Sequence, residues 1–148
     1  MKMFPIKCSM ILSATCLILV FVGCKPSIPN VAGKWHGTAT LTGGHSKSIT
    51  ADISLLLSQQ GTGIHGDAKV VVGGDQAVHI PISTAVIDSK GRLALEGSAN
   101  VTMGTFHFSF DGQDQNDTLR GKTALSVSNV LFGSAASSGP IVFAKTPY

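Results

Sequence analysis

The residues with which this chain could perform chemistry are its five histidines and the acidic segment from Asp111 to Asp117. Histidine is a common base and zinc ligand, but a zinc site needs three or four ligands that converge. The acidic segment lacks the residue spacing of an EF-hand calcium loop. The chain also lacks the Gly-x-Ser-x-Gly elbow, the phosphate-binding glycine loop and the dinucleotide fingerprint of several enzyme classes. No motif among these groups establishes a functional site by itself. Whether they form a site depends on the secondary-structure elements that position them.

The three cysteines lie in the first 24 of the 148 residues, in a segment that has the character of a targeting signal. Residues 1–7 carry two lysines, and residues 8–23 form an uncharged apolar run. The run is shorter than the roughly 20 residues of a membrane-spanning helix, which favours a cleaved signal peptide. From residue 24 onward, nine basic side chains face eight acidic ones, and this balance indicates no binding to nucleic acid.

The end of the apolar run, Phe21-Val22-Gly23-Cys24, resembles the lipobox of bacterial lipoproteins, although the family usually has leucine where Phe21 stands. The resemblance implies cleavage before Cys24 and acylation of this cysteine with palmitate-type chains, which would anchor the protein in a membrane of the cell envelope. The absence of aspartate after the cysteine implies the outer membrane, with the protein facing the periplasm. The alternative is an ordinary signal peptide cleaved elsewhere, with Cys24 incidental.

These observations divide the chain into three parts. We expect a signal peptide over residues 1–23, a lipidated cysteine and tether over residues 24–32, and a folded domain over residues 33–148. Two prolines in the tether disfavour a helix there.

The folded domain contains a repeat of the form apolar-x-Gly-x-small-x-apolar at residues 35–41, 64–70, 95–101 and 119–125, with glycines 24 to 31 residues apart. The segments between the repeats alternate with period two, which is typical of strands. One hairpin per repeat predicts eight strands. Because an inward glycine lets a strand coil sharply, the fold class we expect is all-β, an eight-stranded antiparallel up-and-down meander closed into a small barrel.

Two segments disturb this pattern. Pro81 lacks a ladder donor, so we expect a bulge or a weakly paired point there. Residues 128–140 are longer than ordinary hairpin connections and predict a long loop, with Leu131 and Phe132 near its start. This loop either forms a lid or partner contact, or folds back to cover the barrel end.

The opening of the first strand, Gly33-Lys34-Trp35, resembles the Gly-x-Trp of lipocalin and avidin-like (calycin) barrels. In that family the tryptophan closes one end of the barrel and a basic residue of the last strand stacks on its ring. The resemblance implies these roles for Trp35 and Lys145, and it concerns architecture rather than a particular ligand.

Strand alternation assigns an apolar face to the core, and no titratable side chain lies on it. A register shifted by one residue would bury His65, Asp67 and Lys69 together. The free-energy cost of burying unpaired charged groups excludes this register. Thr84 and Val86 are among the residues predicted to point inward, and Thr123 is the other inward hydroxyl. The histidines fall outside the core, with His36, His65, His79 and His107 on outward faces and His45 in a turn.

An interior without titratable groups offers no catalytic constellation, so we expect no enzyme, no metal and no cofactor. The first hypothesis is a lipid-anchored envelope protein that binds a small apolar ligand in its barrel. The alternative is a structural or interaction lipoprotein with a filled barrel, acting through its outer face or the 128–140 loop; no particular protein partner is indicated. The candidate ligand-binding residues are Trp35, Phe106, Phe108, Leu131 and Phe132.

Overall fold

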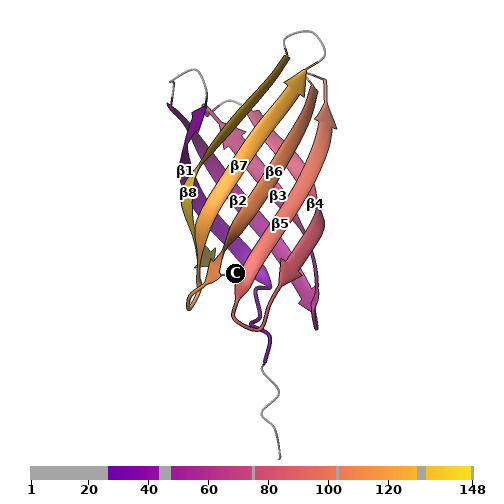
Figure 1. Ribbon diagram of the computed structural model, residues 1–148, viewed down its shortest axis with the longest axis vertical. Helices are drawn as coiled ribbons and strands as arrows, with labels where there is room; N and C mark the ends of the chain where they lie inside the picture. Colours follow the sequence, from indigo (N-terminus) through magenta and orange to yellow (C-terminus); the bar gives the residue numbers. More distant parts are fainter. Residues whose placement is uncertain (1–26, 44–47, 75, 103, 130–132, 148) are drawn as a thin grey trace, which may run out of the picture.

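The computed structural model describes residues 27–43, 48–74, 76–102, 104–129 and 133–147. These residues form eight antiparallel strands, each paired with its sequence neighbours, and the last strand pairs with the first to close the barrel. Figure 1 shows the tilted strands around one axis. The predicted fold class is confirmed. The strands are β1 (Gly33–Gly43), β2 (Ser48–Gln60), β3 (Gly63–Val72), β4 (Gln76–Ile87), β5 (Arg92–Val101), β6 (Gly104–Asp114), β7 (Thr118–Asn129) and β8 (Gly133–Thr146).

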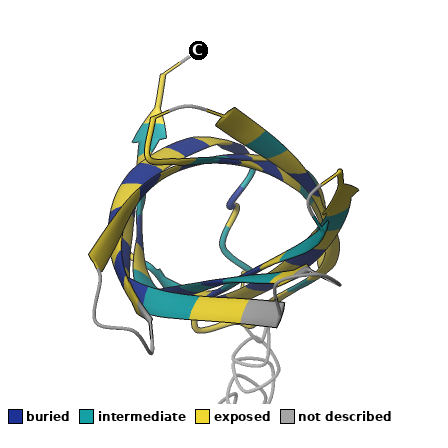
Figure 2. Ribbon diagram, turned by 90° about the horizontal axis from the view of Figure 1, so that it is seen from above, coloured by how far each residue is buried: buried dark blue, intermediate teal, exposed yellow. Residues whose placement is uncertain are grey.

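Alternation of side chains builds the core, because successive residues of a strand point to opposite faces. In β5, Leu93 and Leu95 are fully buried while their neighbours Arg92 and Glu96 are exposed. Figure 2 shows the same alternation of buried and exposed residues around the barrel wall. The apolar period of two in the sequence therefore corresponds to the inner face of the barrel.

The fourth strand departs from the predicted alternation at a β-bulge. Ile82 pairs with Gly97 and Thr84 pairs with Glu96, so Ser83 is an extra residue on β4. A bulge moves every later side chain of its strand to the other face. The inward placement of Thr84 and Val86 was therefore wrong: both are exposed, and Val86 has 59% of its surface accessible. Pro81 itself pairs with Asp67 of β3, so the bulge lies two residues beyond it.

The predicted loop over residues 128–140 was also wrong, because β7 continues to Asn129 and β8 begins at Gly133. The first half of β8 is Ser, Ala and Gly, a composition with no alternating apolar signal, yet it pairs with β7 along its whole length. Gly139 lies so close to the carbonyl of Thr40 in β1 that a side chain would collide there. At Gly139, the close approach of β1 therefore requires a residue without a side chain.

Much of the barrel interior is filled with side chains. Phe110 and Phe143 meet edge to face, with ring centroids 5.3 Å apart and an interplanar angle of 77°. A Cβ atom on Gly37 would lie 2.7 Å from the carbonyl oxygen of Val142 and 3.0 Å from the ring of Phe143. Repeat glycines such as Gly37 are thus places where neighbouring strands and core side chains approach closely, as well as points of coiling.

Residues 27–32 pack across one end of the barrel, which we call the base. Val31 is fully buried, and its N–H donates to the Gln59 side chain over 2.8 Å. The amide of Gln59 donates in turn to the carbonyl of Pro29 over 3.0 Å. Figure 2, seen from the other end, shows this segment crossing the barrel axis. The described part of the predicted tether is therefore packed against the barrel.

Candidate ligand-binding site

The end of the barrel opposite the base, which we call the mouth, is lined by apolar side chains that point inward and are partly open to solvent. Ile49 is 42% exposed, and Val72 and Val101 are each 37% exposed, although all three lie on the core face of their strands. The polar residues Gln76 and Ser137 also lie on the inner face near this end. The apolar part of this lining is formed by Ile49, Val72, Val78, Val101, Phe106 and Val127.

Strand pairing places the lining residues around one opening. Phe106 lies between Ala99 of β5 and Val127 of β7 as a direct cross-strand neighbour of both. Cross-strand neighbours have Cβ atoms about 4.5–5.5 Å apart, so these side chains form a continuous apolar surface. Such a surface can hold an apolar group by burial, at about 25 cal/mol for each Å² removed from water.

The structure separates the predicted ligand-binding residues. Phe106 lies at the mouth and is half-buried, whereas Phe108 is 1% exposed and belongs to the filled interior. Trp35 is 2% exposed and lies at the base, at the opposite end from Phe106. Leu131 and Phe132 lie outside the described residues, as does the predicted lipidation site Cys24.

The mouth residues Ile49, Val72 and Val101 were not singled out from the sequence. Their alternation assigned them correctly to the inner face, but their exposure depends on which barrel end residues 27–32 cover. Each stands within a few residues of a strand end, and this position next to a turn is the signal that could have marked them.

Trp35 closes the base in the way that the calycin resemblance implies. Its indole Nε1 donates to the carbonyl of Val31 over 2.9 Å, and the Nζ of Lys145 lies 5.2 Å from the ring centroid. A cation over an indole face is attracted by the ring quadrupole. A basic residue of the last strand thus meets the tryptophan of the first strand.

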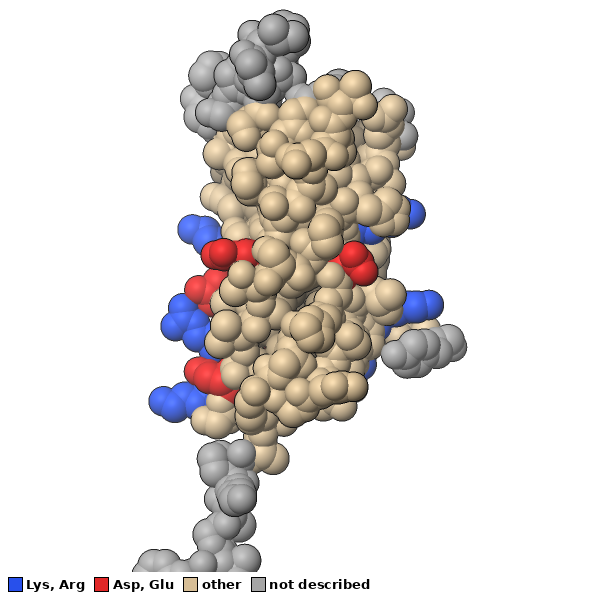
Figure 3. Space-filling model, turned by 90° about the vertical axis from the view of Figure 1, so that its right-hand side faces the viewer, with Lys and Arg blue, Asp and Glu red and all other residues tan. Residues whose placement is uncertain are grey.

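Charge is distributed unevenly along the barrel. Among the described residues, the charged side chain nearest the mouth in any strand is still at least three residues from that strand's end, and β4 carries none. In Figure 3 the described atoms of the upper part of the visible face carry no blue or red side chains. The part of the wall around the mouth that the structure describes is therefore uncharged, which suits an apolar ligand.

The groups with shifted pKa values lie in the half of the barrel near the base. Arg92 donates two hydrogen bonds to Asp111, over 2.8 and 3.1 Å, and this interaction holds the pKa of Asp111 below its usual value. Partial burial raises the pKa of Asp114, against an opposing effect of Lys145. The ion pair between Arg92 and Asp111 is exposed and, like most surface ion pairs, contributes little to the stability of the fold.

His36, His65, His79 and His107 are exposed on outward faces, as predicted, and His45 lies outside the described residues. Within the described ranges, no group of three or more His, Cys, Asp or Glu side chains gathers in a metal-binding arrangement. The Nδ1 of His36 lies 3.2 Å from the hydroxyl oxygen of Ser54.

In the portion of the chain that the structure describes, no helix has the length and hydrophobicity needed to cross a membrane. Comparison of the chain with protein-family models, with curated proteins and with solved structures finds no match. The function must therefore be argued from the barrel itself.

Proposed function

We propose that this protein is a lipid-anchored, non-enzymatic component of the cell envelope that binds a small apolar ligand at the mouth of its barrel. The observation that carries the proposal is the exposure of Ile49, Val72 and Val101 on the inner face of the barrel. Apolar side chains at such positions lose contact with water when a ligand enters the opening.

The filled interior limits the depth and size of the ligand. Phe108, Phe110 and Phe143 occupy the barrel below the mouth and are nearly inaccessible to solvent. An acyl chain or another slender apolar group would therefore insert its end among the mouth residues, with the rest of the molecule outside. This mode differs from that of a barrel with a deep central cavity.

The ligand can be tested in living cells that produce the full chain. Cells are fed a palmitate analogue that carries a photoreactive diazirine, then irradiated, and the cross-linked peptides are mapped by mass spectrometry. We expect cross-links in the peptides that contain Val72, Val101 or Phe106. Covalent label on Cys24 would be distinguished by its position.

A matched pair of variants makes the test specific. Val101→Glu places a charge in the mouth and should abolish the cross-links there, because burying an unpaired carboxylate is costly. Val86→Glu places the same charge on an exposed outward site near the base and should leave them unchanged. Cross-links that survive equally in both variants, or that are absent from the mouth of the unaltered protein, would contradict ligand binding.

The anchor is tested separately. We expect Cys24→Ala to release the protein from the membrane fraction and to abolish incorporation of an alkyne-bearing palmitate. Cys16→Ala should keep both properties, because Cys16 lies in the predicted signal peptide. A Cys24→Ala protein that remains in the membrane fraction would contradict the proposed lipidation.

A second candidate, an interaction or structural lipoprotein, is favoured by the dense packing around Gly37 and the three core phenylalanines. In this case the barrel serves as a rigid support, and the outer wall makes the contacts. Residues 133–140 would then act as part of that wall, since they belong to β8. Absence of label at the mouth, together with retained anchoring, is the result expected for this candidate.

A further inference from the structure

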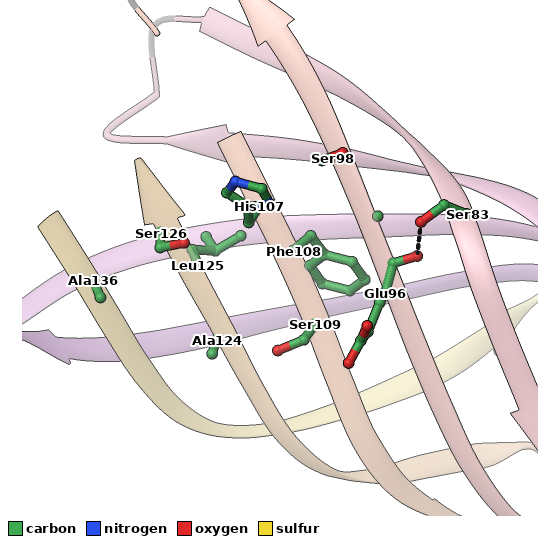
Figure 4. A pocket seen from close by; sticks show the side chains of 11 residues that line it. Ser83, Glu96, Ser98, His107, Phe108, Ser109, Ala124, Leu125, Ser126 and Ala136 are labelled. Carbon is green, nitrogen blue, oxygen red and sulfur yellow. Dashed lines mark hydrogen bonds between the residues drawn. The ribbon is translucent and has the colours of Figure 1, made fainter. Parts of the chain in front are cut away.

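The outer wall of the barrel carries a hollow of about 430 Å³ that spans β4 to β8 and faces away from the interior. Figure 4 shows the side chains around it, with those of Glu96 and His107 standing among serines and alanines. The hollow is distinct from the mouth and from the base. Its lining is Ser83, Glu96, Gly97, Ser98, His107, Phe108, Ser109, Ala124, Leu125, Ser126 and Ala136.

The hollow forms because small side chains occupy the outward positions of adjacent strands. Ser98, His107 and Ser126 form one row across β5, β6 and β7, in direct register. Glu96 and Ser109 lie in the next row, toward the base. Since cross-strand neighbours have Cβ atoms about 4.5–5.5 Å apart, these residues form a continuous stretch of wall, and all five line the hollow.

The polar groups of the hollow are available to a ligand. Ser83 donates its hydroxyl to the backbone carbonyl of Glu96 over 3.2 Å, as the dashed line in Figure 4 shows, and leaves the carboxylate itself unengaged. Within the described part of the chain, neither the carboxylate of Glu96 nor the ring of His107 has a hydrogen-bond partner. A serine hydroxyl can both donate and accept hydrogen bonds, and a carboxylate accepts them. In a neutral imidazole one nitrogen donates and the other accepts.

The composition of the lining excludes other ligand classes. It contains no lysine or arginine to neutralise a phosphate or sulfate group, and the charge of Glu96 repels such anions. Its two large apolar residues, Phe108 and Leu125, are buried and belong to the core side of the wall, so an acyl chain finds little apolar surface. One carboxylate and one imidazole are too few ligands for a typical zinc site.

A second outer hollow shows that this composition is not general to the barrel. It measures about 530 Å³, lies over β8 and β1 to β4, and is lined in part by Lys34, Asp67 and Lys69 around the exposed Leu56. That surface mixes both signs of charge with an apolar side chain. The hollow over β4 to β8 has instead one acidic group and no basic one.

We propose that the hollow centred on Glu96 and His107 binds a neutral, hydroxyl-rich ligand, namely a segment of glycan. Sugar hydroxyls donate to the carboxylate of Glu96 and exchange hydrogen bonds with His107 and the surrounding serines. The shallow, open shape of the hollow suits a chain lying across the strands. This proposal is independent of a ligand at the mouth.

The experiment is a titration of the ¹⁵N-labelled full chain with cellotetraose and with chitotetraose, followed by ¹H–¹⁵N correlation spectra in a detergent without a sugar headgroup. We expect saturable shifts at the amides of residues 96–98, 107–109 and 124–126 with at least one of these tetrasaccharides. Glu96→Gln and His107→Ala should each weaken binding about tenfold or more. The first variant removes the charged acceptor of the sugar hydroxyls, and the second removes the imidazole that exchanges hydrogen bonds with them.

His65→Ala is the matched control, since His65 is equally exposed on an outward face but lies on β3, outside the hollow. It should bind as the unaltered chain does. Circular dichroism of each variant checks that the barrel remains folded. The proposal is overturned if neither sugar causes saturable shifts at millimolar concentration, if Glu96→Gln and His107→Ala bind normally, or if Zn²⁺ alone saturates the hollow while both sugars fail.

Discussion

Trp35 connects three parts of the chain that are far apart in sequence. It belongs to β1, donates to the carbonyl of Val31 in the segment before the barrel, and lies under the ammonium of Lys145 from β8. Its ring is 2% exposed, so the side chain also supplies a large buried apolar surface. One residue thereby joins the leading segment, the first strand and the last strand at the base.

We expect Trp35→Ala to lower the free energy of unfolding by about 3–5 kcal/mol, which is the usual effect of removing a large buried aromatic side chain. Trp35→Phe keeps a ring but leaves the carbonyl of Val31 without its donor, so its effect should be smaller, about 1–3 kcal/mol. Urea unfolding followed by circular dichroism measures both. Equal stability of the Trp35→Ala protein and the unaltered protein would show that the base does not depend on this residue.

At the scale of the elements, the bulge at Ser83 determines which residues of β4 face the core. Before it, Ile80 is fully buried; after it, Ala85 and Ile87 take the inward positions. The extra residue lets β4 change phase without disturbing β3, with which it pairs in continuous register up to Pro81. The strand thus places apolar side chains on the inner face on both sides of the bulge.

Two neighbouring substitutions test this register. Ile87→Ala should destabilise the barrel by about 2–5 kcal/mol, because Ile87 is buried. Val86→Ala should change stability by no more than about 0.5 kcal/mol, because Val86 is exposed. Thermal and urea unfolding of the two proteins give the comparison. The reverse order of effects would mean that β4 runs without a bulge.

Regular alternation explains why most elements were predictable. In β2 and β5 the apolar residues recur at every second position and need only one face to be buried, so their inward sets follow from sequence. Ser83 could not be placed in this way, because a bulge depends on the register with β5. The first half of β8 was missed because Ser, Ala and Gly carry no period, and barrel closure supplies the pairing instead.

The candidate sites were less predictable for a related reason. Strand alternation predicts that both Phe106 and Phe108 point inward. It does not predict how far each lies from the open end of the barrel. The outer hollow depends on which serines and alanines become neighbours across strands, and that follows from register rather than from local sequence. Neither property is encoded within a single strand.

On the scale of the whole molecule, the barrel has two unlike ends. The base is closed by residues 27–32, Trp35 and Gln59, and most charged side chains of the described strands lie in the half nearest to it. The mouth is apolar, and the wall around it is uncharged among the described residues. The two ends of the barrel therefore differ: one is closed and the other is open.

Given the proposed acylation of Cys24, the packing of Val31 and Pro29 across the base would set the direction in which the protein stands on a membrane. Only four residue steps separate Cys24 from Ile28, which packs against the core, and a fully extended chain of that length spans at most about 14 Å. An acylated Cys24 would thus hold the base close to the lipid surface, and the mouth would point away from it. A ligand would then arrive from the aqueous side or from an opposing surface, rather than by lateral exchange with the bilayer that holds the anchor.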